Sequence, residues 1–303
     1  MSKKKSTAIR LSKGDQAMET IINIVMSILF LVVLYPLVYV VSSSFSSGDA
    51  VFNGKVILWP VDFSTYGYEI VLRNPKVWIG YKNTIINTVL GTVMNVFTTT
   101  LVAYPLARRE FQGKGFYMFI FMFTMWFGGG LVPSYLLMSD LGLVNNRLAV
   151  LLTGLISISN MVVMRSFFRS SIPADLHDAA RVDGISDLGY LVKIVLPLSK
   201  AIFSVVTLYY AVAHWNAYFS AMIYLRDPSM MTLQQVLKDL LAQANPSMDD
   251  IQGLTAEEIA DMQYAADLMK YSLIVISSAP ILCAYPFVQK YFEKGVMIGS
   301  VKG

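Results

Sequence analysis

Charged residues are scarce in this chain. They make up 15% of its 303 residues, whereas a soluble domain carries about a quarter. Six long stretches contain no Asp, Glu, Lys or Arg at all. Ion-coupled secondary transporters place charges inside their membrane spans and are commonly built from internal repeats. Because neither feature is found here, a self-sufficient secondary transporter is only a weaker alternative.

Cysteine and histidine are rarer still. Cys283 is the only cysteine and His177 and His214 are the only histidines, which excludes an internal disulfide and a cysteine-rich metal site. The two histidines are expected on opposite faces of a membrane, which argues against paired-histidine metal catalysis. The phosphate-binding Gly-x-x-x-x-Gly-Lys-Ser/Thr motif and the Gly-x-Ser-x-Gly motif of hydrolases are both missing. We therefore expect no enzyme activity and no cofactor in this chain.

Apolar residues dominate instead, at 55% of the chain with a mean hydropathy of +0.55. A helix needs about 17 to 25 residues to cross a hydrocarbon core of about 30 Å. Strand-like alternation is absent, so helices are expected. The sequence predicts an all-α polytopic membrane protein with six transmembrane helices, at residues 20–47, 83–107, 115–139, 148–164, 201–225 and 271–289.

Lys and Arg are distributed unevenly between the loops of this arrangement. They concentrate in the N-terminus, in the second and fourth loops and in the C-terminus, and basic residues near span ends stay in the cytoplasm. The net charge of +4 thus fits membrane orientation and not nucleic-acid binding. We expect a cytoplasmic N-terminal segment, a six-helix domain and a cytoplasmic tail, at 1–19, 20–292 and 293–303.

Two long loops, 48–82 and 226–270, are expected outside the cell. The second is acidic and contains Thr255 followed three residues later by Glu258, a pattern typical of a capping box that opens a short surface helix. Two interpretations remain open for this loop. It is either a solvated helical cap or a docking surface for an external partner.

The cytoplasmic loop 170–200 has the start and stop signals of two short helices. Pro173 and Asp175 favour a helix start, and Gly184 suits a left-handed stop. Ser186 then opens a second helix that ends near Pro197. The small side chains of the first helix would let it approach a partner closely.

The same loop resembles the signature of the permease subunits of binding-protein-dependent ATP-binding-cassette importers. That signature is Glu-Ala-Ala, three residues, Gly, nine residues, an aliphatic residue, any residue and Leu-Pro. This chain matches it, with Asp in place of Glu, at Asp178, Ala179, Ala180, Gly184, Ile194, Leu196 and Pro197. Three parts of the chain resemble the carbohydrate-uptake branch of the family. They are Asp183 within the loop, residues 127–133 taken together with 141–143, and residues 294–303.

The resemblance implies a type I importer permease in the bacterial plasma membrane. It implies as partners a second permease, a dimer of ATPase subunits that bind ATP and Mg, an extracytoplasmic solute-binding protein, a carbohydrate and membrane lipid. The loop helix would sit in a cleft of the ATPase. The residues expected to couple to it are Asp178, Ala179, Ala180, Asp183, Gly184, Leu196 and Pro197.

Residues 201–225 also carry the mixture of aromatic and hydrogen-bonding side chains that sugar sites use. The candidates for the substrate pathway are Tyr210, His214, Trp215, Asn216 and Tyr218. Aromatic residues equally form interfacial belts and helix contacts, so helix packing is the other interpretation. An importer of a non-sugar solute remains the alternative function. The polar residues of the second span, including Asn83, Asn87 and Asn95, are expected mainly to hydrogen-bond between helices.

Overall fold

The computed structural model describes residues 12–243 and 255–300, and these form helices and no strands. The predicted all-α class is therefore confirmed. The chain divides into two compact units. Unit 1 comprises Met1–Val71 and Gln243–Val275, and unit 2 comprises Leu72–Ala242 and Ile276–Gly303.

Unit 1 contains α1 (Lys13–Ser44), α2 (Gly48–Phe52), most of α3 (Tyr66–Arg73) and the first half of α15 (Ala256–Ser300). The side chain of Ser12 accepts from the Asp15 backbone, and Asp15 accepts from the Ser12 backbone, so a capping box fixes the start of α1. Before residue 42 no residue of α1 is buried. An apolar helix with so little protein around it is suited to lipid.

Unit 2 contains the remaining helices. They are α4 (Pro75–Ala107), α5 (Lys114–Trp126), α6 (Leu131–Asp140), α7 (Arg147–Leu152), α8 (Ile158–Ser171), α9 (Ala174–Val182), α10 (Asp187–Tyr190), the π-helix η1 (Leu191–Val195), α11 (Leu196–Leu198), α12 (Lys200–Trp215), α13 (Phe219–Tyr224), the 3-10 helix η2 (Pro228–Met230) and α14 (Leu233–Gln243). The second half of α15 belongs to this unit.

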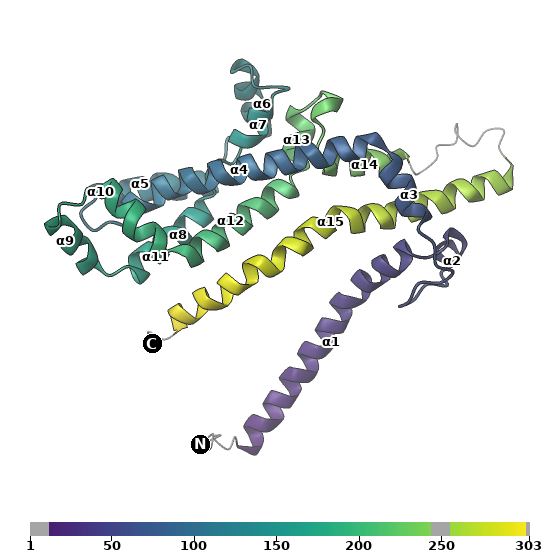
Figure 1. Cartoon of the computed structure of the whole chain (residues 1–303), viewed down its shortest axis with the longest axis horizontal. Coiled ribbons are helices and arrows are strands. Elements are labelled where there is room, and N and C mark those ends of the chain that lie inside the picture. Colours follow the sequence, from purple (N-terminus) through teal and green to yellow (C-terminus); the bar gives the residue numbers. More distant parts are fainter. Residues whose placement is uncertain (1–11, 244–254, 301–303) are drawn as a thin grey trace. The chain divides into compact units, whose positions relative to one another are not determined.

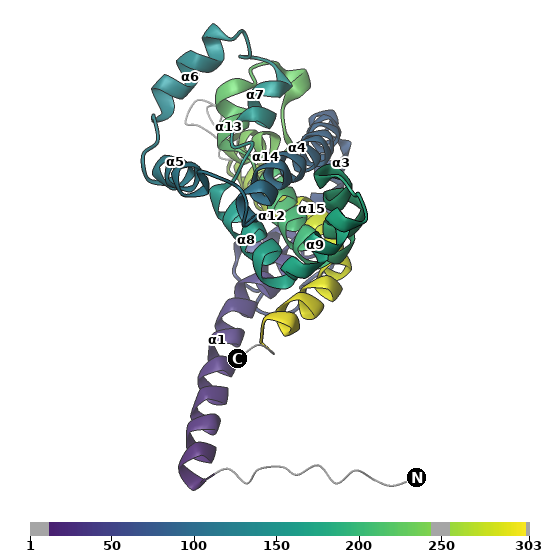
Figure 2. The same cartoon turned by 90° about the vertical axis from the view of Figure 1, so that its left-hand side faces the viewer.

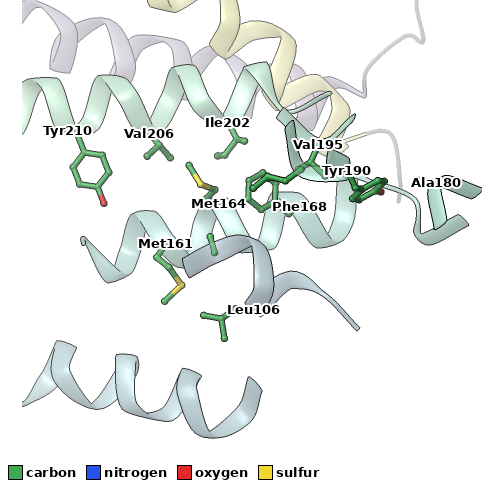
Figure 3. Packing of buried hydrophobic residues seen from close by; sticks show 12 residues of the cluster. Leu106, Met161, Met164, Phe168, Ala180, Tyr190, Val195, Ile202, Val206 and Tyr210 are labelled. Carbon is green, nitrogen blue, oxygen red and sulfur yellow. The ribbon is translucent and has the colours of Figure 1, made fainter. Parts of the chain in front are cut away.

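The core of unit 2 lies where α4, α8 and α12 pack together (Figure 1). Met161 and Met164 of α8 are fully buried, and they lie between Leu106 of α4 and the residues Ile202 and Val206 of α12 (Figure 3). The same apolar cluster extends to Ala180, Tyr190 and Val195. The cytoplasmic loop predicted from the sequence is thus continuous with the core, which gives the loop a rigid base.

Three helical segments of the described residues are long and apolar enough to cross a membrane. They are Lys13–Ser44, Pro75–Ala107 and Asp261–Ala284, which match the first, second and last predicted spans. Two bent helix pairs would raise the number to five. Six continuous spanning helices are therefore not confirmed.

The predicted span 115–139 is wrong as one continuous helix. It divides into α5 and α6, which are bent by 110° (Figure 2). The residues between them include three consecutive glycines, and Gly130 has a φ of +85°. Glycine carries no Cβ and adopts such backbone angles without strain, so the helix ends here.

The predicted spans 148–164 and 201–225 are also interrupted. Between α7 and α8 the chain turns at Gly154, with φ +75°, and restarts where Ser157 caps α8. α12 ends at Trp215, and three residues, 216–218, separate it from α13. On its other side, α12 forms a pair bent by 84° with the segment Asp187–Leu198.

The capping box of Thr255 and Glu258 is confirmed, because each residue's backbone N–H donates to the other's side chain. It does not open a short surface helix, however. It opens α15, which is 45 residues long. Parts of three predicted segments lie outside the described residues. They are residues 1–11 of the N-terminal segment, 244–254 of the acidic loop and 301–303 of the C-terminal tail.

Candidate functional site

The helix α9 lies in the cytoplasmic loop predicted from the sequence, and both of its ends are fixed. It begins after Pro173, whose backbone is extended, and Asp175 lies in its first turn. Its last residue is Val182, and the turn after it contains Gly184, which has a φ of +73°. The backbone of Ile185 donates to Ala180 and that of Gly184 donates to Arg181, the two hydrogen bonds of a Schellman motif. The left-handed stop predicted at Gly184 is present.

One face of α9 is turned into the protein and the other is open. His177 and Ala180 are buried, whereas Asp178 and Ala179 are exposed. Val182 is 88% exposed, which is unusual for an aliphatic residue next to a packed core. Leu188 of α10 is 68% exposed. Exposed apolar residues on a rigid helix pair are typical of a surface that binds another protein.

A group of ionic side chains joins α9 to the end of α4. We call Arg108, Glu110, His177 and Asp187 the α9 cluster. Arg108 follows the last residue of α4, and its guanidinium lies 3.2 Å from a Glu110 carboxylate oxygen and 3.2 Å from an Asp187 oxygen. It also hydrogen-bonds the ring of His177. Arg108 thereby connects α4, α9 and α10 through one side chain.

The charges of this cluster stabilise one another. The His177 ring and the Arg108 guanidinium lower the pKa of the Asp187 carboxyl. A hydrogen bond from its own backbone and the contact with Arg108 lower the pKa of Glu110. Both carboxylates are consequently ionised at neutral pH, so the cluster holds its geometry there.

Aromatic rings enclose the Arg108 side chain. Its Nη1 donates to the Tyr104 hydroxyl over 2.7 Å, and its carbon Cζ lies 5.6 Å and 5.9 Å from the ring centroids of Tyr104 and Tyr190. The His177 ring meets Tyr190 edge-on at 5.1 Å. Planar guanidinium groups pack well on aromatic faces. The contact surface between α4 and α9 is thus ordered by both charge and packing.

The segment after α9 carries the remaining residues predicted to couple to an ATPase. The Ser186 side chain caps α10, as the sequence predicts. The chain then continues through η1 into α11, where Leu196 packs on the apolar core and Pro197 is exposed. Proline has no N–H, so a regular α-helix would lack a hydrogen bond here. The π-helix η1 lies immediately before this position.

The candidate pathway residues fall into two groups. Tyr210, His214 and Trp215 are buried, and their polar atoms form hydrogen bonds within the chain. The Tyr210 hydroxyl lies 2.7 Å from Thr99 Oγ1, and His214 Nε2 lies 3.4 Å from Asn95 Oδ1. The Trp215 indole N–H donates to the Ser277 carbonyl over 3.0 Å. These contacts agree with the helix-packing interpretation. Asn216 is exposed and Tyr218 is half-buried.

Gly91 explains how α12 approaches α4 so closely. A Cβ atom at Gly91 would lie 2.4 Å from the His214 ring, closer than two such atoms can be. Asn95, one turn further along α4, also donates to the backbone of Gly154. The polar residues of the second span therefore hydrogen-bond between helices, as predicted.

The hydrogen-bond donor to Asn83 and Asn87 was not predicted from the sequence. The guanidinium of Arg147 donates to Asn83 Oδ1 and to Asn87 Oδ1, each over 2.8 Å. Asn83 and Asn87 lie four residues apart, so both project from one face of α4. That spacing was a usable signal, but nothing in the sequence identified Arg147. The α9 cluster was missed for the same reason, because Arg108 and His177 are 69 residues apart.

Comparison with known proteins agrees with this geometry. Residues 6–298 match the family described as "Binding-protein-dependent transport system inner membrane component". The polygalacturonan/rhamnogalacturonan transport system permease protein YtcP of Bacillus subtilis (strain 168) is 34% identical, over 90% of this chain and 94% of that protein. Protein LplC of the same organism is 33% identical, over 92% of this chain and 94% of its own length.

A solved structure shares the fold. It is a crystal structure of a bacterial ABC transporter involved in the import of the acidic polysaccharide alginate, and the similar chain has 36% sequence identity and a TM-score of 0.83. The match covers 94% of this chain and 100% of that one. With a family match over most of its length, this chain belongs to the inner membrane components of binding-protein-dependent transport systems.

Proposed function

We propose that this chain is the permease subunit of an ABC importer that takes up an acidic oligosaccharide. The importer class and the carbohydrate cargo follow from the family and from the relatives. The acidic class is supported by two of them. Polygalacturonan is a chain of galacturonate units, and alginate is named as an acidic polysaccharide. YtcP and the alginate importer chain, whose names contain these cargoes, are 34% and 36% identical to this chain.

The observation that carries the coupling part of the proposal is the geometry of α9. Its two ends are fixed, its inner face is tied to α4 through Arg108, and its outer face exposes Ala179 and Val182. A rigid helix of this kind can transmit a rigid-body rotation, whereas a flexible loop could not. In this proposal the outer face of α9 inserts into an ATPase subunit, and closure of the ATPase dimer moves α4 with α9.

The topology completes the proposal. Six crossings result if the interrupted segments α5–α6, α7–α8 and α12–α13 each count as one crossing beside α1, α4 and α15. The distribution of Lys and Arg then supports a cytoplasmic location for both termini and for α9. A second permease would supply the other half of the pathway, and a solute-binding protein would deliver the sugar from outside.

Reconstitution tests this proposal. The complete importer, with both permeases, the ATPase and the binding protein, would be placed in lipid vesicles and supplied with trigalacturonate. We expect uptake that depends on ATP and on the binding protein. Uptake without any ATPase subunit would contradict the importer class, and uptake of neutral but not of acidic oligosaccharides would contradict the acidic cargo alone.

A further inference from the structure

The helices α13 and α14 lie in unit 2 at the end opposite α9 (Figure 1). Residues of these helices and of the loop between them line a polar pocket. We call it the cationic pocket. It is an open cavity of about 310 Å³ between the end of α13 and the exposed side of α14, and its polar lining residues are Tyr218, Arg226, Gln235, Lys238 and Asp239. None of the coupling residues lies in it.

The two cations of this pocket have hydrogen-bonding capacity to spare. Within the described ranges, neither Arg226 nor Lys238 has a carboxylate oxygen within 4.0 Å. Arg226 donates one hydrogen bond to the Tyr135 hydroxyl over 2.6 Å, and the Lys238 ammonium contacts the Met222 sulfur at 3.8 Å. Lys238 also interacts with the Tyr218 hydroxyl. A guanidinium has five N–H donors and an ammonium has three, so among the described residues most donors of Arg226 and at least one of Lys238 have no partner.

The pocket has an ordered frame. Asn145 has a φ of +60°, and its side-chain oxygen accepts from the backbone N–H groups of Arg226 and Asp227, over 3.1 Å and 2.9 Å. The carboxylate of Asp227 is turned to the backbone of Ser229. Asp239 is thus the only acidic group among the lining residues. On the other side, Lys238 stands on α14, which the buried Leu233 and Leu240 hold against the unit.

An aromatic ring lies beside the two cations. The Lys238 ammonium is 5.1 Å from the ring centroid of Tyr218. Sugars present apolar C–H faces that pack on aromatic rings, and carboxylates bind Arg and Lys through charge-assisted hydrogen bonds. A uronic acid unit is the chemical group that combines both properties.

We infer that the cationic pocket binds a uronate unit of the transported oligosaccharide, with its carboxylate between Arg226 and Lys238 and its ring against Tyr218. This inference rests on the proposed function, because it assigns a site to the acidic cargo. Among the candidate pathway residues it selects Tyr218. It also adds Arg226 and Lys238, which were not among the candidates predicted from the sequence.

Equilibrium binding to the solubilised permease–ATPase complex, without the binding protein, tests the inference directly. The probes are trigalacturonate and its methyl ester, which keeps the sugar but removes the charge. We expect wild type to bind the acid about tenfold more tightly than the ester, since a charge-assisted hydrogen bond contributes enough for such a ratio. The double variant Arg226→Gln, Lys238→Gln should bind both probes equally weakly. Lys76→Gln, at the exposed start of α4, is the matched control.

Three results would overturn the inference. They are equal affinity of wild type for acid and ester, no detectable binding of the acid, or a double variant that still prefers the acid. A fourth result would also overturn it: if the double variant keeps the wild-type affinities for both probes but raises the binding-protein concentration that half-activates the ATPase, the cations bind carboxylates of that protein and not the cargo. Normal uptake of trigalacturonate by the wild-type importer would leave the proposed function intact in each case.

Discussion

The two ends of unit 2 differ in how their cations are partnered. At the α9 end, Arg108 lies 3.2 Å from both Glu110 and Asp187. At the α13–α14 end, Arg226 and Lys238 have no carboxylate within 4.0 Å among the described residues. Paired charges with aromatic packing fix a contact, whereas unpaired charges in an open cavity are available to a ligand. Under the two proposals made above, the α9 end transmits force and the α13–α14 end recognises the cargo.

The largest effect is expected from Arg108→Ala. This change removes the side chain that joins α4 to α9 and leaves the buried His177 ring without its guanidinium partner, at a cost of about 2 kcal/mol. We expect uptake to fall about tenfold or more while ATP hydrolysis continues. Transport and ATPase rates would be measured in parallel. Arg109→Ala, at the exposed neighbouring position, should behave as wild type, and equal losses in both variants would show that charge alone matters.

Gly184→Val should have the next largest effect. At φ +73° a β-branched residue is strained by about 1 to 2 kcal/mol, so the Schellman end of α9 would open. Uptake should fall several-fold with membrane insertion unchanged. The matched variant is Gly184→Asn, because asparagine tolerates this conformation. Full uptake in the valine variant would mean that α9 needs no fixed end.

Trp215→Phe distinguishes packing from substrate recognition. The change removes the indole N–H that donates to the Ser277 carbonyl, and loss of this hydrogen bond costs about 1 kcal/mol. We expect a lower unfolding temperature and less assembled complex. Trp126→Phe is the control, since Trp126 is 77% exposed. Normal assembly with reduced uptake would instead support the substrate-pathway interpretation.

The smallest effect is a pH dependence of the α9 cluster. Folding lowers the pKa values of Asp187 and Glu110, so the unfolded chain binds more protons than the folded chain as pH falls. The stabilisation is therefore complete above the ordinary carboxyl pKa of about 4 and is lost as pH drops through the lowered values. The unfolding temperatures of wild type and Asp187→Asn should converge only below about pH 4. Convergence already near pH 6 would contradict the ion pairs, and Asp261→Asn, at an exposed site, should show no such trend.

Local signals predicted much of the coupling loop. Proline, glycine and serine at fixed positions determine where short helices begin and end, so α9 and α10 could be placed from the sequence. Long apolar runs likewise predicted α1, α4 and the apolar part of α15. The bends were missed because hydropathy does not distinguish a straight helix from one interrupted at Gly130 or Gly154, or from one that ends at Trp215.

Long-range contacts could not be predicted from one sequence. The roles of Arg108 and Arg147 depend on residues about 60 to 80 positions away, and no local pattern encodes that proximity. Burial also changed the interpretation of Tyr210, His214 and Trp215, because a polar aromatic residue serves helix packing as readily as ligand binding. The cationic pocket depends in the same way on the loop after α13 meeting α14.

Site-directed cross-linking tests the central claim most directly. A cysteine at the exposed position Ala179, in a chain whose Cys283 is replaced by serine, would be combined with single cysteines along the cleft of the partner ATPase. We predict a cross-link from Ala179→Cys that forms in the assembled importer and abolishes uptake until it is reduced. A fully assembled and active importer in which position 179 cross-links to no ATPase residue would contradict the account.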